Sequence, residues 1–457
     1  MCLGFTGCSK YLDKLDDPNL VPEPPLNGVL VKVTYETSVD VFRMGNVVSY
    51  YTQYLSSNVR ASDADIYNPV DYSTTWSNFY LAMMNIKQMN DLAASTGASH
   101  HLGVGKILLA LNLNMLVNTF GDVPYSSALK GLDQLIPTFD NQAALHDTTI
   151  SLLNQGIAEL GKSSTVILDG QSDLIHKGDV NAWIKTAHAL KARFLNQLSK
   201  KSVYSPTTIL TEIDNAYKSN AEDAALTAFS GRSPWNGVAY NNTQLLLDGW
   251  LSTQLVDALN GTTYGVVDPR LAKIATITKF NDYRGTPNGA GRIGTGTNQE
   301  ESYLSVNGYY SSGNAPLWLA TYAEMKFIEA EAAFRSANPA RAYTAYLEGI
   351  RSNLTKVGVV EPALSSYLTN PAVSVGQGAL TLDLIFKEKY VAMFLNPESW
   401  VDARRYDYKY KDFTLPANAA LSTFIRRLAY PTIETSRNGT NVPTITSLDQ
   451  KLAFDGN

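Results

Sequence analysis

Aromatic residues in predicted loops are the side chains of this sequence best suited to hold a ligand. The chain has 26 Tyr against 15 Phe, and a Tyr or Trp ring can cover the apolar C–H face of a sugar while its polar atom stays in water. These rings gather in three segments, at 67–76, 235–240 and 283–310. We therefore expect ligand contacts from Tyr67, Tyr72, Trp76, Trp235, Tyr240, Tyr283, Tyr309 and Tyr310.

The two cysteines, Cys2 and Cys8, lie at the very start of the chain. A disulfide framework or a Cys-based zinc site in the remainder is therefore excluded. Small residues directly before Cys8, in Thr6-Gly7-Cys8-Ser9, are typical of a bacterial lipoprotein signal that ends at an acylated cysteine. We predict that residues 1–7 are a signal remnant and that Cys8 carries lipid. The alternative, two accidental thiols in a cytosolic protein, stays open because the charged and long apolar parts of a signal are missing.

Residues for catalysis or metal binding are poorly placed. None of the five histidines stands three or four residues from another, so we expect no metal and no cofactor. The string Gly289-Ala290-Gly291-Arg292-Ile293-Gly294 is a literal G-x-G-x-x-G, but no strand precedes it and no helix follows, which favours a loop over a dinucleotide site. Asp63, Asp65 and Asp71 could supply an acid and base pair, although solvated loop carboxylates are the simpler interpretation.

Composition describes the body that must position these groups. With 457 residues, 44% of them hydrophobic, the chain can bury a large core, and a net charge of −5 without a basic block disfavours nucleic acid. No run of about 18 apolar residues predicts a membrane-spanning helix. Residues 8–25 are rich in proline and acid, which predicts an extended, lipid-anchored tether, and 26–457 is predicted to form a single domain.

Helical periodicity dominates after the tether. Trp183, Ala187, Leu190, Phe194 and Leu198 share one face of a helix for which Asp179 is the expected N-cap. Trp183, Trp318 and Trp400 are expected in the core, on helices. We predict helices at 26–54, 74–95, 105–120, 142–160, 206–220, 319–335, 340–356, 382–393 and 398–408, and long functional loops at 229–242 and 281–314.

Several short strings resemble, in their order, the SusD/RagB family of outer-membrane nutrient-binding lipoproteins, in particular its SusD-like branch. They are Gly121-Asp122-Val123-Pro124-Tyr125, Gly178-Asp179 with Trp183, Ala189-Leu190-Lys191-Ala192-Arg193, Asp268-Pro269-Arg270, Tyr322-Ala323-Glu324, Glu329-Ala330-Glu331-Ala332, Glu398-x-Trp400-x-Asp402-x-Arg404-Arg405, and Arg427-Leu428-x-Tyr430-Pro431 with Glu434. Most of these strings read as scaffold. The charged residues around Trp400 in particular can pair along one helix.

The resemblance implies a mainly α fold, in which tetratricopeptide-like helix pairs support a loop-rich remainder with little β structure. It also implies a non-enzymatic protein, anchored by lipid at the cell surface, that binds an oligosaccharide and works with a SusC-like TonB-dependent outer-membrane channel. The family shares no catalytic motif, and its ligand residues vary, so none is transferred here.

Three alternatives remain at this stage. The protein could capture peptides, as the family also permits, or act as a helical carbohydrate-active hydrolase with paired carboxylates. It could also be an assembly subunit that seals the channel without touching nutrient. The sequence does not identify a glycan.

Overall fold

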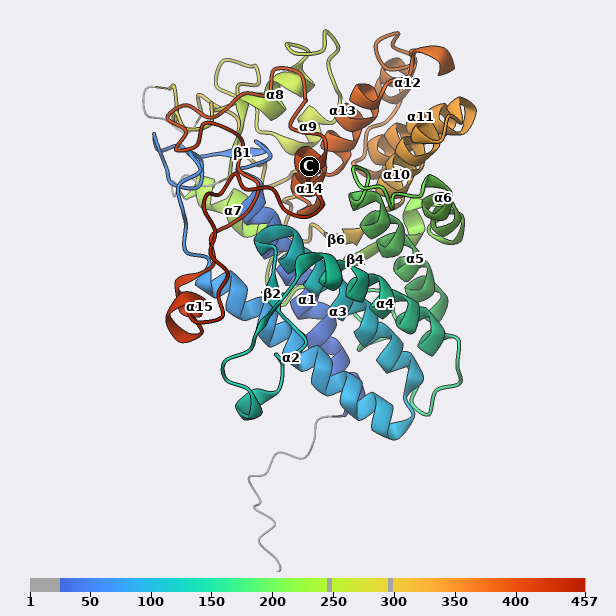
Figure 1. Ribbon diagram of the computed structural model, residues 1–457. Helices are drawn as coiled ribbons and strands as arrows, with labels where there is room; N and C mark the ends of the chain where they lie inside the picture. The colour runs from blue at the N-terminus through green and yellow to red at the C-terminus, as the bar shows by residue number, and fades with distance from the viewer. Residues whose placement is uncertain (1–24, 245–248, 295–298, 457) are drawn as a thin grey trace, which may run out of the picture.

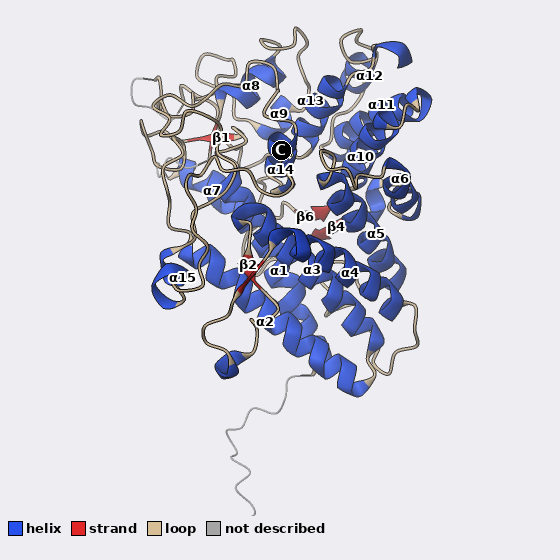
Figure 2. Cartoon of the chain, viewed as in Figure 1, coloured by secondary structure: helices blue, strands red, loops and turns tan. Residues whose placement is uncertain are grey.

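The computed structural model describes residues 25–244, 249–294 and 299–456. Helices make up about half of this part of the chain, and the strands are short, as Figure 2 shows. The expected mainly α class is therefore confirmed. The predicted signal remnant 1–7 and all but the last residue of the tether 8–25 lie outside the described residues.

The helices are α1 (Leu26–Val48), α2 (Ser73–Thr96), α3 (Ser99–Phe120), α4 (Gln142–Leu160), α5 (Val180–Gln197), α6 (Pro206–Asn215), α7 (Pro234–Thr243), α8 (Thr253–Asn260), α9 (Leu271–Ile274), α10 (Tyr322–Arg335), α11 (Pro339–Lys356), α12 (Ala363–Leu368), α13 (Leu382–Ala392), α14 (Glu398–Arg405) and α15 (Thr432–Arg437). Short 3₁₀ turns are η2 (Gly131–Asp133), η3 (Asn220–Glu222) and η4 (Gln377–Ala379). Three antiparallel pairs join β1 (Leu55–Ser56) with β5 (Trp250–Leu251), β2 (Val123–Pro124) with β3 (Phe139–Asp140), and β4 (Ala224–Leu226) with β6 (Leu317–Ala320).

Consecutive helices pack against each other. α1 contacts α2, α2 contacts α3, α3 contacts α4 and α5 contacts α6, while α10 packs on α11 and returns to contact α5 and α6 (Figure 1). This is the arrangement of tetratricopeptide-like pairs. One hydrophobic cluster runs through it from Leu26 to Phe454.

Helix α3 is the centre of this stack. It is the one helix in the described part that is long and apolar enough to cross a membrane by composition, but 89% of its apolar window is buried inside the protein. Its asparagines are buried and paired: Asn112 donates to Thr37 Oγ1 at 2.9 Å, and Asn114 donates to the Gln197 side chain at 3.1 Å. α3 is therefore a core helix.

Local sequence signals set several boundaries as expected. The Asp179 side chain accepts from the amides of Asn181 and Ala182 and so caps α5, whose Trp183 is fully buried. Helix α3 ends at Phe120 because Gly121 follows with φ 85°, a conformation that favours glycine.

The segment 229–242 corrects a prediction. It was expected to be a loop, but residues from Pro234 onward form α7, with Pro at the first turn, where its missing N–H costs nothing. Trp235 and Tyr240 therefore lie on a helix. Trp318 lies on β6 and is only half-buried, which differs from the expected helical core position. The segment 281–314 holds no helix or strand among its described residues and is a loop as predicted.

Candidate functional site

Three loops meet at Gly289, close to β1, because neighbouring Asn288 donates to the Leu55 carbonyl at 2.9 Å. Strand β1 lies at the loop-rich end, at the upper left of Figure 1. The Gly289 carbonyl accepts from the Ala61 amide at 3.0 Å and from Asn418 Nδ2 at 3.1 Å, and the Ala417 amide donates to the Asn288 carbonyl at 2.9 Å. Gly289 has φ 76°, and a Cβ there would lie 1.9 Å from the Ala417 carbonyl oxygen. The first glycine of the G-x-G-x-x-G string therefore allows two loops to pack closely at this point.

The Asp65 side chain stabilises this loop junction through hydrogen bonds. Its buried carboxylate accepts from the Gly289 amide at 2.6 Å, from Asn288 Nδ2 at 2.5 Å and from Ser56 Oγ at 3.2 Å. Burial raises the pKa of Asp65, and the hydrogen bonds from Gly289 and Asn288 oppose that rise. Asp65 is therefore a structural group and is not the solvated loop carboxylate expected.

The other two candidate carboxylates are exposed, as expected of solvated loop residues, and each accepts hydrogen bonds from neighbouring residues. Exposed Asp63 accepts from Asn68 Nδ2 at 2.9 Å. Asp71 accepts from the Thr432 hydroxyl at 2.6 Å and from the Ser73 hydroxyl at 2.7 Å, which joins the starts of α2 and α15. These hydrogen bonds, led by the one from Thr432, lower the pKa of Asp71 to about 2. No acid and base pair forms among the three, since each is bound to other groups.

Beside the loop junction lies an open polar cleft with a cavity volume of about 520 Å³. This size lies within the range of small-molecule sites, about 300–1,000 Å³. Its walls come from the turn after α1, the start of α8, the 281–294 loop and the 412–417 segment. The lining residues are Gln53, Ser252, Thr253, Gln254, Asp257, Thr262, Thr263, Pro287, Asn288, Asp412, Thr414, Leu415, Pro416 and Ala417.

Hydrogen bonds between the walls fix the shape of the polar cleft. Gln53 Nε2 donates to the Thr414 carbonyl at 2.7 Å, and Gln254 Nε2 donates to the Lys411 carbonyl at 3.2 Å. Ser252 caps α8 and also donates to Asn288 Oδ1 at 2.5 Å. Each wall is therefore tied to a second segment, and the cleft is preorganised for a ligand.

Two carboxylates, Asp257 and Asp412, line the polar cleft. Burial raises the pKa of Asp257, and the nearby charge of Asp412 adds to that rise. Thr253 Oγ1 is buried without a hydrogen-bond partner among the described residues. Carboxylate, hydroxyl and amide groups facing the C–H surfaces of Pro287 and Pro416 form an environment that suits a neutral polyol.

The eight predicted aromatic residues do not share one surface, and none lines the polar cleft. Four are buried: Tyr67 at 1% exposure, Trp76 at 3%, Trp235 at 4% and Tyr310 at 6%. Trp76 packs against Tyr80 with ring centroids 5.0 Å apart, and Trp235 meets Phe42 edge-on at 4.8 Å. Their rings are largely used in packing.

The remaining four predicted residues reach solvent at separate places. Tyr240 is 39% exposed, with the Arg232 guanidinium 4.0 Å above its ring. Tyr283 is half-buried in the 281–314 loop, and half-buried Tyr309 lies parallel to Trp318 with ring centroids 6.4 Å apart. Half-buried Tyr72 has its hydroxyl 3.0 Å from that of Tyr51.

Sequence reasoning missed the polar cleft because its walls come from four distant segments. One local signal was present: on the short helix α8, Gln254 and Asp257 are three residues apart and face the cleft, while Leu255, Val256 and Leu259 are buried. The polar face of a short amphipathic helix marks one wall but does not identify the others.

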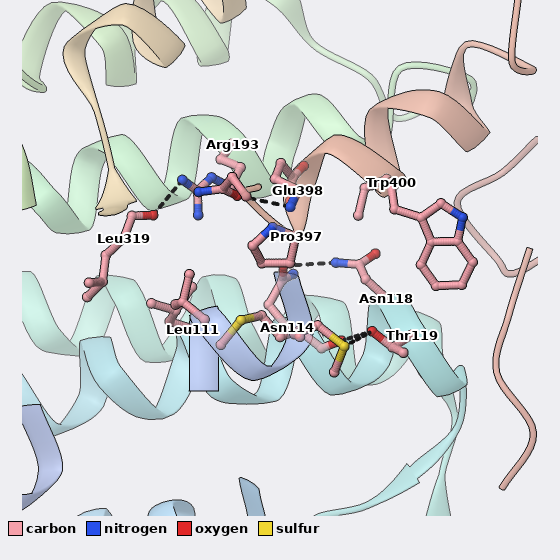
Figure 3. A pocket seen from close by; sticks show the side chains of 14 residues that line it. Leu111, Asn114, Asn118, Thr119, Arg193, Leu319, Pro397, Glu398 and Trp400 are labelled. Atoms are coloured by element: carbon pink, nitrogen blue, oxygen red, sulfur yellow. Dashed lines mark hydrogen bonds between the residues drawn. The ribbon is translucent and has the colours of Figure 1, made fainter. Parts of the chain in front are cut away.

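A second pocket, shown in Figure 3, lies inside the helix stack where α14 meets α3 and α5. Its cavity volume is about 20 Å³, enough for about one water molecule and too small for a nutrient. Arg193 donates to both oxygens of Glu324 at 2.5 Å, and Gln197 Nε2 donates to Glu398 at 2.9 Å. Burial raises the pKa of Glu398 to about 8, against the opposing charge of Arg193.

The charged residues of α14 form the scaffold that was expected. Arg405 donates to Glu331 and Asp402, each at 2.6 Å, and Lys389 Nζ lies 2.8 Å from Asp402. Trp400 is 1% exposed. All these charges are buried and paired, so they connect α14 with α10 and α13. In the described ranges, no group of three His, Cys, Asp or Glu residues could hold a metal ion.

The helix pairs, the loop junction and the polar cleft together define a helical protein with a candidate ligand site at its loop-rich end. The chain belongs to the SusD-like family described as "Starch-binding associating with outer membrane", whose match covers residues 20–431. By family assignment, SusD homologues are carbohydrate-binding proteins and not enzymes.

Solved structures support the fold independently. A SusD/RagB family protein from Bacteroides thetaiotaomicron is similar with a TM-score of 0.77 at 21% identity, over 95% of this chain and 99% of that one. A chitin-binding SusD homolog from Flavobacterium johnsoniae gives 0.79 at 19% identity, over 94% and 99%. A SusD homolog from Bacteroides fragilis gives 0.75 at 21% identity, over 95% and 100%. Comparison with curated protein sequences finds no match.

Proposed function

We propose that this protein binds an oligosaccharide in the polar cleft and passes it to a SusC-like TonB-dependent outer-membrane channel. The family supports carbohydrate as the ligand class, and two of the structural neighbours are described as chitin-binding. The single observation that carries the choice of site is the preorganised cleft of about 520 Å³, lined by hydroxyl, amide and carboxylate groups.

The proposed contacts follow from the chemistry of the lining. Asp257 and Asp412 accept hydrogen bonds from sugar hydroxyls. Pro287 and Pro416 offer their C–H surfaces to the sugar rings. Of the predicted aromatic residues, Tyr240 and Tyr283 are retained as proposed outer contacts, because both rings reach solvent on the loop-rich end.

Calorimetry with a panel of chito- and malto-oligosaccharides tests this proposal. We expect one glycan class to bind and the Asp257→Asn/Asp412→Asn variant to lose at least about tenfold in affinity, because hydrogen bonds to charged groups contribute ~1.5–3 kcal/mol each. Asp91→Asn is the matched control, since Asp91 is an exposed carboxylate on α2 paired with Lys87. Peptide binding without any glycan binding would contradict the proposal and favour peptide capture.

The lipid anchor and the channel are further parts of the proposal. Cys8 lies outside the described residues, and its sequence context, together with a family that associates with the outer membrane, supports acylation and a cell-surface location. Replacing Cys8 with Ala should move the protein from the membrane fraction to the soluble fraction. Co-purification with a SusC-like channel from the same cells tests the partnership, and a Cys8→Ala protein that stays in the membrane fraction would contradict the anchor.

A further inference from the structure

The loop between β2 and β3 carries an exposed apolar tip. Leu132 is 89% exposed, Leu135 71% and Ile136 50%. Single exposed apolar side chains are ordinary, but three within five residues form a patch of the kind that marks an interaction surface. We call these three residues the apolar tip.

The base of this hairpin is firmly held. β2 and β3 pair Val123 with Asp140 and Pro124 with Phe139. The Asp140 carboxylate accepts from the Tyr125 and Ser126 amides, both at 2.8 Å, and from the Ser126 hydroxyl at 2.5 Å. Asn438, next to α15, donates to the Pro137 carbonyl at 2.8 Å. The apolar tip is therefore presented on a structured support.

Two cations accompany the apolar tip. Lys130 and Arg437 line the groove of about 380 Å³ between α2, the hairpin and α15, and both are exposed. Glu434 lines the same groove, and exposed Asp133 lies between Leu132 and Leu135. Neither cation forms an ion pair with a residue of the described part. Apolar side chains beside free cations match the interface of a membrane with anionic headgroups, which takes apolar groups and attracts Lys and Arg.

The place of the apolar tip favours the membrane over other partners. In Figure 1 the short teal helix η2, at the tip of the hairpin, lies at the lower edge of the molecule, as does the start of α1. Ile167, 81% exposed, lies beside that start, since Asn27 Nδ2 is 3.5 Å from its carbonyl oxygen. The described chain begins with Pro25 at this edge, while α8, which supplies residues to the polar cleft, lies in the upper part of the view.

We propose that the lower end of the molecule is a lipid-contacting surface, on which the apolar tip enters the interface of an anionic membrane and Lys130 and Arg437 contact the headgroups. This contact would fix the orientation of the body relative to the bilayer. The inference builds on the proposed membrane location, but the surface acts without the acyl chain.

Vesicle co-sedimentation of the full chain carrying Cys8→Ala tests the surface without the lipid anchor. The vesicles are phosphatidylcholine with or without about one third phosphatidylglycerol. We expect binding to the anionic vesicles that falls with salt, and a loss of about tenfold or more when Leu132, Leu135 and Ile136 are changed to Ser. The control variant changes Val267, Ile277 and Ile293 to Ser. These side chains are 65%, 54% and 72% exposed at other places on the surface, and the vesicle affinity of this variant should stay within about twofold of the unchanged protein.

Further variants separate the contribution of the two cations to membrane binding from that of the apolar tip. Lys130→Gln/Arg437→Gln should weaken binding to anionic vesicles and reduce its dependence on salt. Leu132→Trp should place a fluorophore that brominated lipid quenches. Absence of vesicle binding, or equal loss in the tip and control variants, would overturn the proposal, as would a tip variant that binds vesicles normally and fails only to join the channel. Glycan calorimetry on the same variants distinguishes this failure from failure of the glycan-binding proposal, because the apolar tip is remote from the polar cleft.

Discussion

Replacing Gly289 with Ala should disrupt the loop junction far more than an ordinary glycine substitution. Gly289 has φ 76°, and an added Cβ would lie 1.9 Å from the Ala417 carbonyl oxygen, where contacts below 3.0 Å force a displacement. A left-handed conformation alone costs an alanine about 1–2 kcal/mol. Moving Ala417 away also strains its hydrogen bond to Asn288 and the bonds that the Gly289 carbonyl accepts from Ala61 and Asn418.

Losing two or three of these hydrogen bonds adds about 1–3 kcal/mol, so the Gly289→Ala variant should lose ~2–5 kcal/mol of unfolding free energy. Gly358→Ala is the matched control, because Gly358 has φ 79° and no atom within 4 Å of its added Cβ. It should lose only about 1–2 kcal/mol.

Urea unfolding of the two variants measures the difference. Because Asn288 and Ala417 line the polar cleft, Gly289→Ala should also weaken glycan binding, whereas Gly358→Ala should not. Equal destabilisation of the two variants would refute the steric argument, and an unchanged glycan affinity in Gly289→Ala would refute the link between the loop junction and the cleft.

Three further predictions concern stability. Trp235→Ala should cost about 3–5 kcal/mol in urea unfolding and Tyr240→Ala less than about 1, because the first ring is 4% exposed and the second 39%; similar costs would contradict the packing described. Burial lowers the pKa of His101 to about 4, so the unfolded chain takes up a proton first as pH falls below about 6.5 and the protein loses stability, by up to ~1.4 kcal/mol per pH unit. His101→Gln should reduce that slope in unfolding curves measured between pH 6.5 and 5, and an unchanged slope would argue against a buried neutral imidazole. Arg405→Gln should cost ~3–5 kcal/mol, since it leaves Glu331 and Asp402 buried beside a neutral side chain, and a thermal unfolding midpoint equal to that of the unchanged protein would count against the network.

Local signals in the sequence were sufficient for the helical frame. Asp179 before the Trp183 stripe predicted the start of α5, and Gly121 predicted the end of α3, because capping and chirality act within a few residues. The charged run around Trp400 was correctly interpreted as scaffold, since its spacing on one helix permits pairing. Predicted helices were too long at their C-terminal ends, as at 206–220, where α6 ends at Asn215.

The ligand site could not be predicted in the same way. The segment around Trp235 and Tyr240 is rich in Ser, Pro, Gly and Asn, a composition that predicted a loop. Pro234 instead occupies the first turn of helix α7. Aromatic type alone does not separate a ring that packs, as Trp76 does against Tyr80 and Phe120, from a ring that faces a ligand. The polar cleft depends on contacts such as Gln53 to Thr414, 361 residues apart, which no local pattern reports.

The central claim, that the polar cleft holds an oligosaccharide, is tested most directly by a crystal structure with the best-binding glycan from the calorimetry panel. The account predicts sugar density in the cleft, with hydroxyls within hydrogen-bond distance of Asp257 and Asp412 and a sugar ring against Pro287 or Pro416. Sugar bound elsewhere, for example against Trp76 in the groove between α2 and α15, with the polar cleft unoccupied, would contradict it.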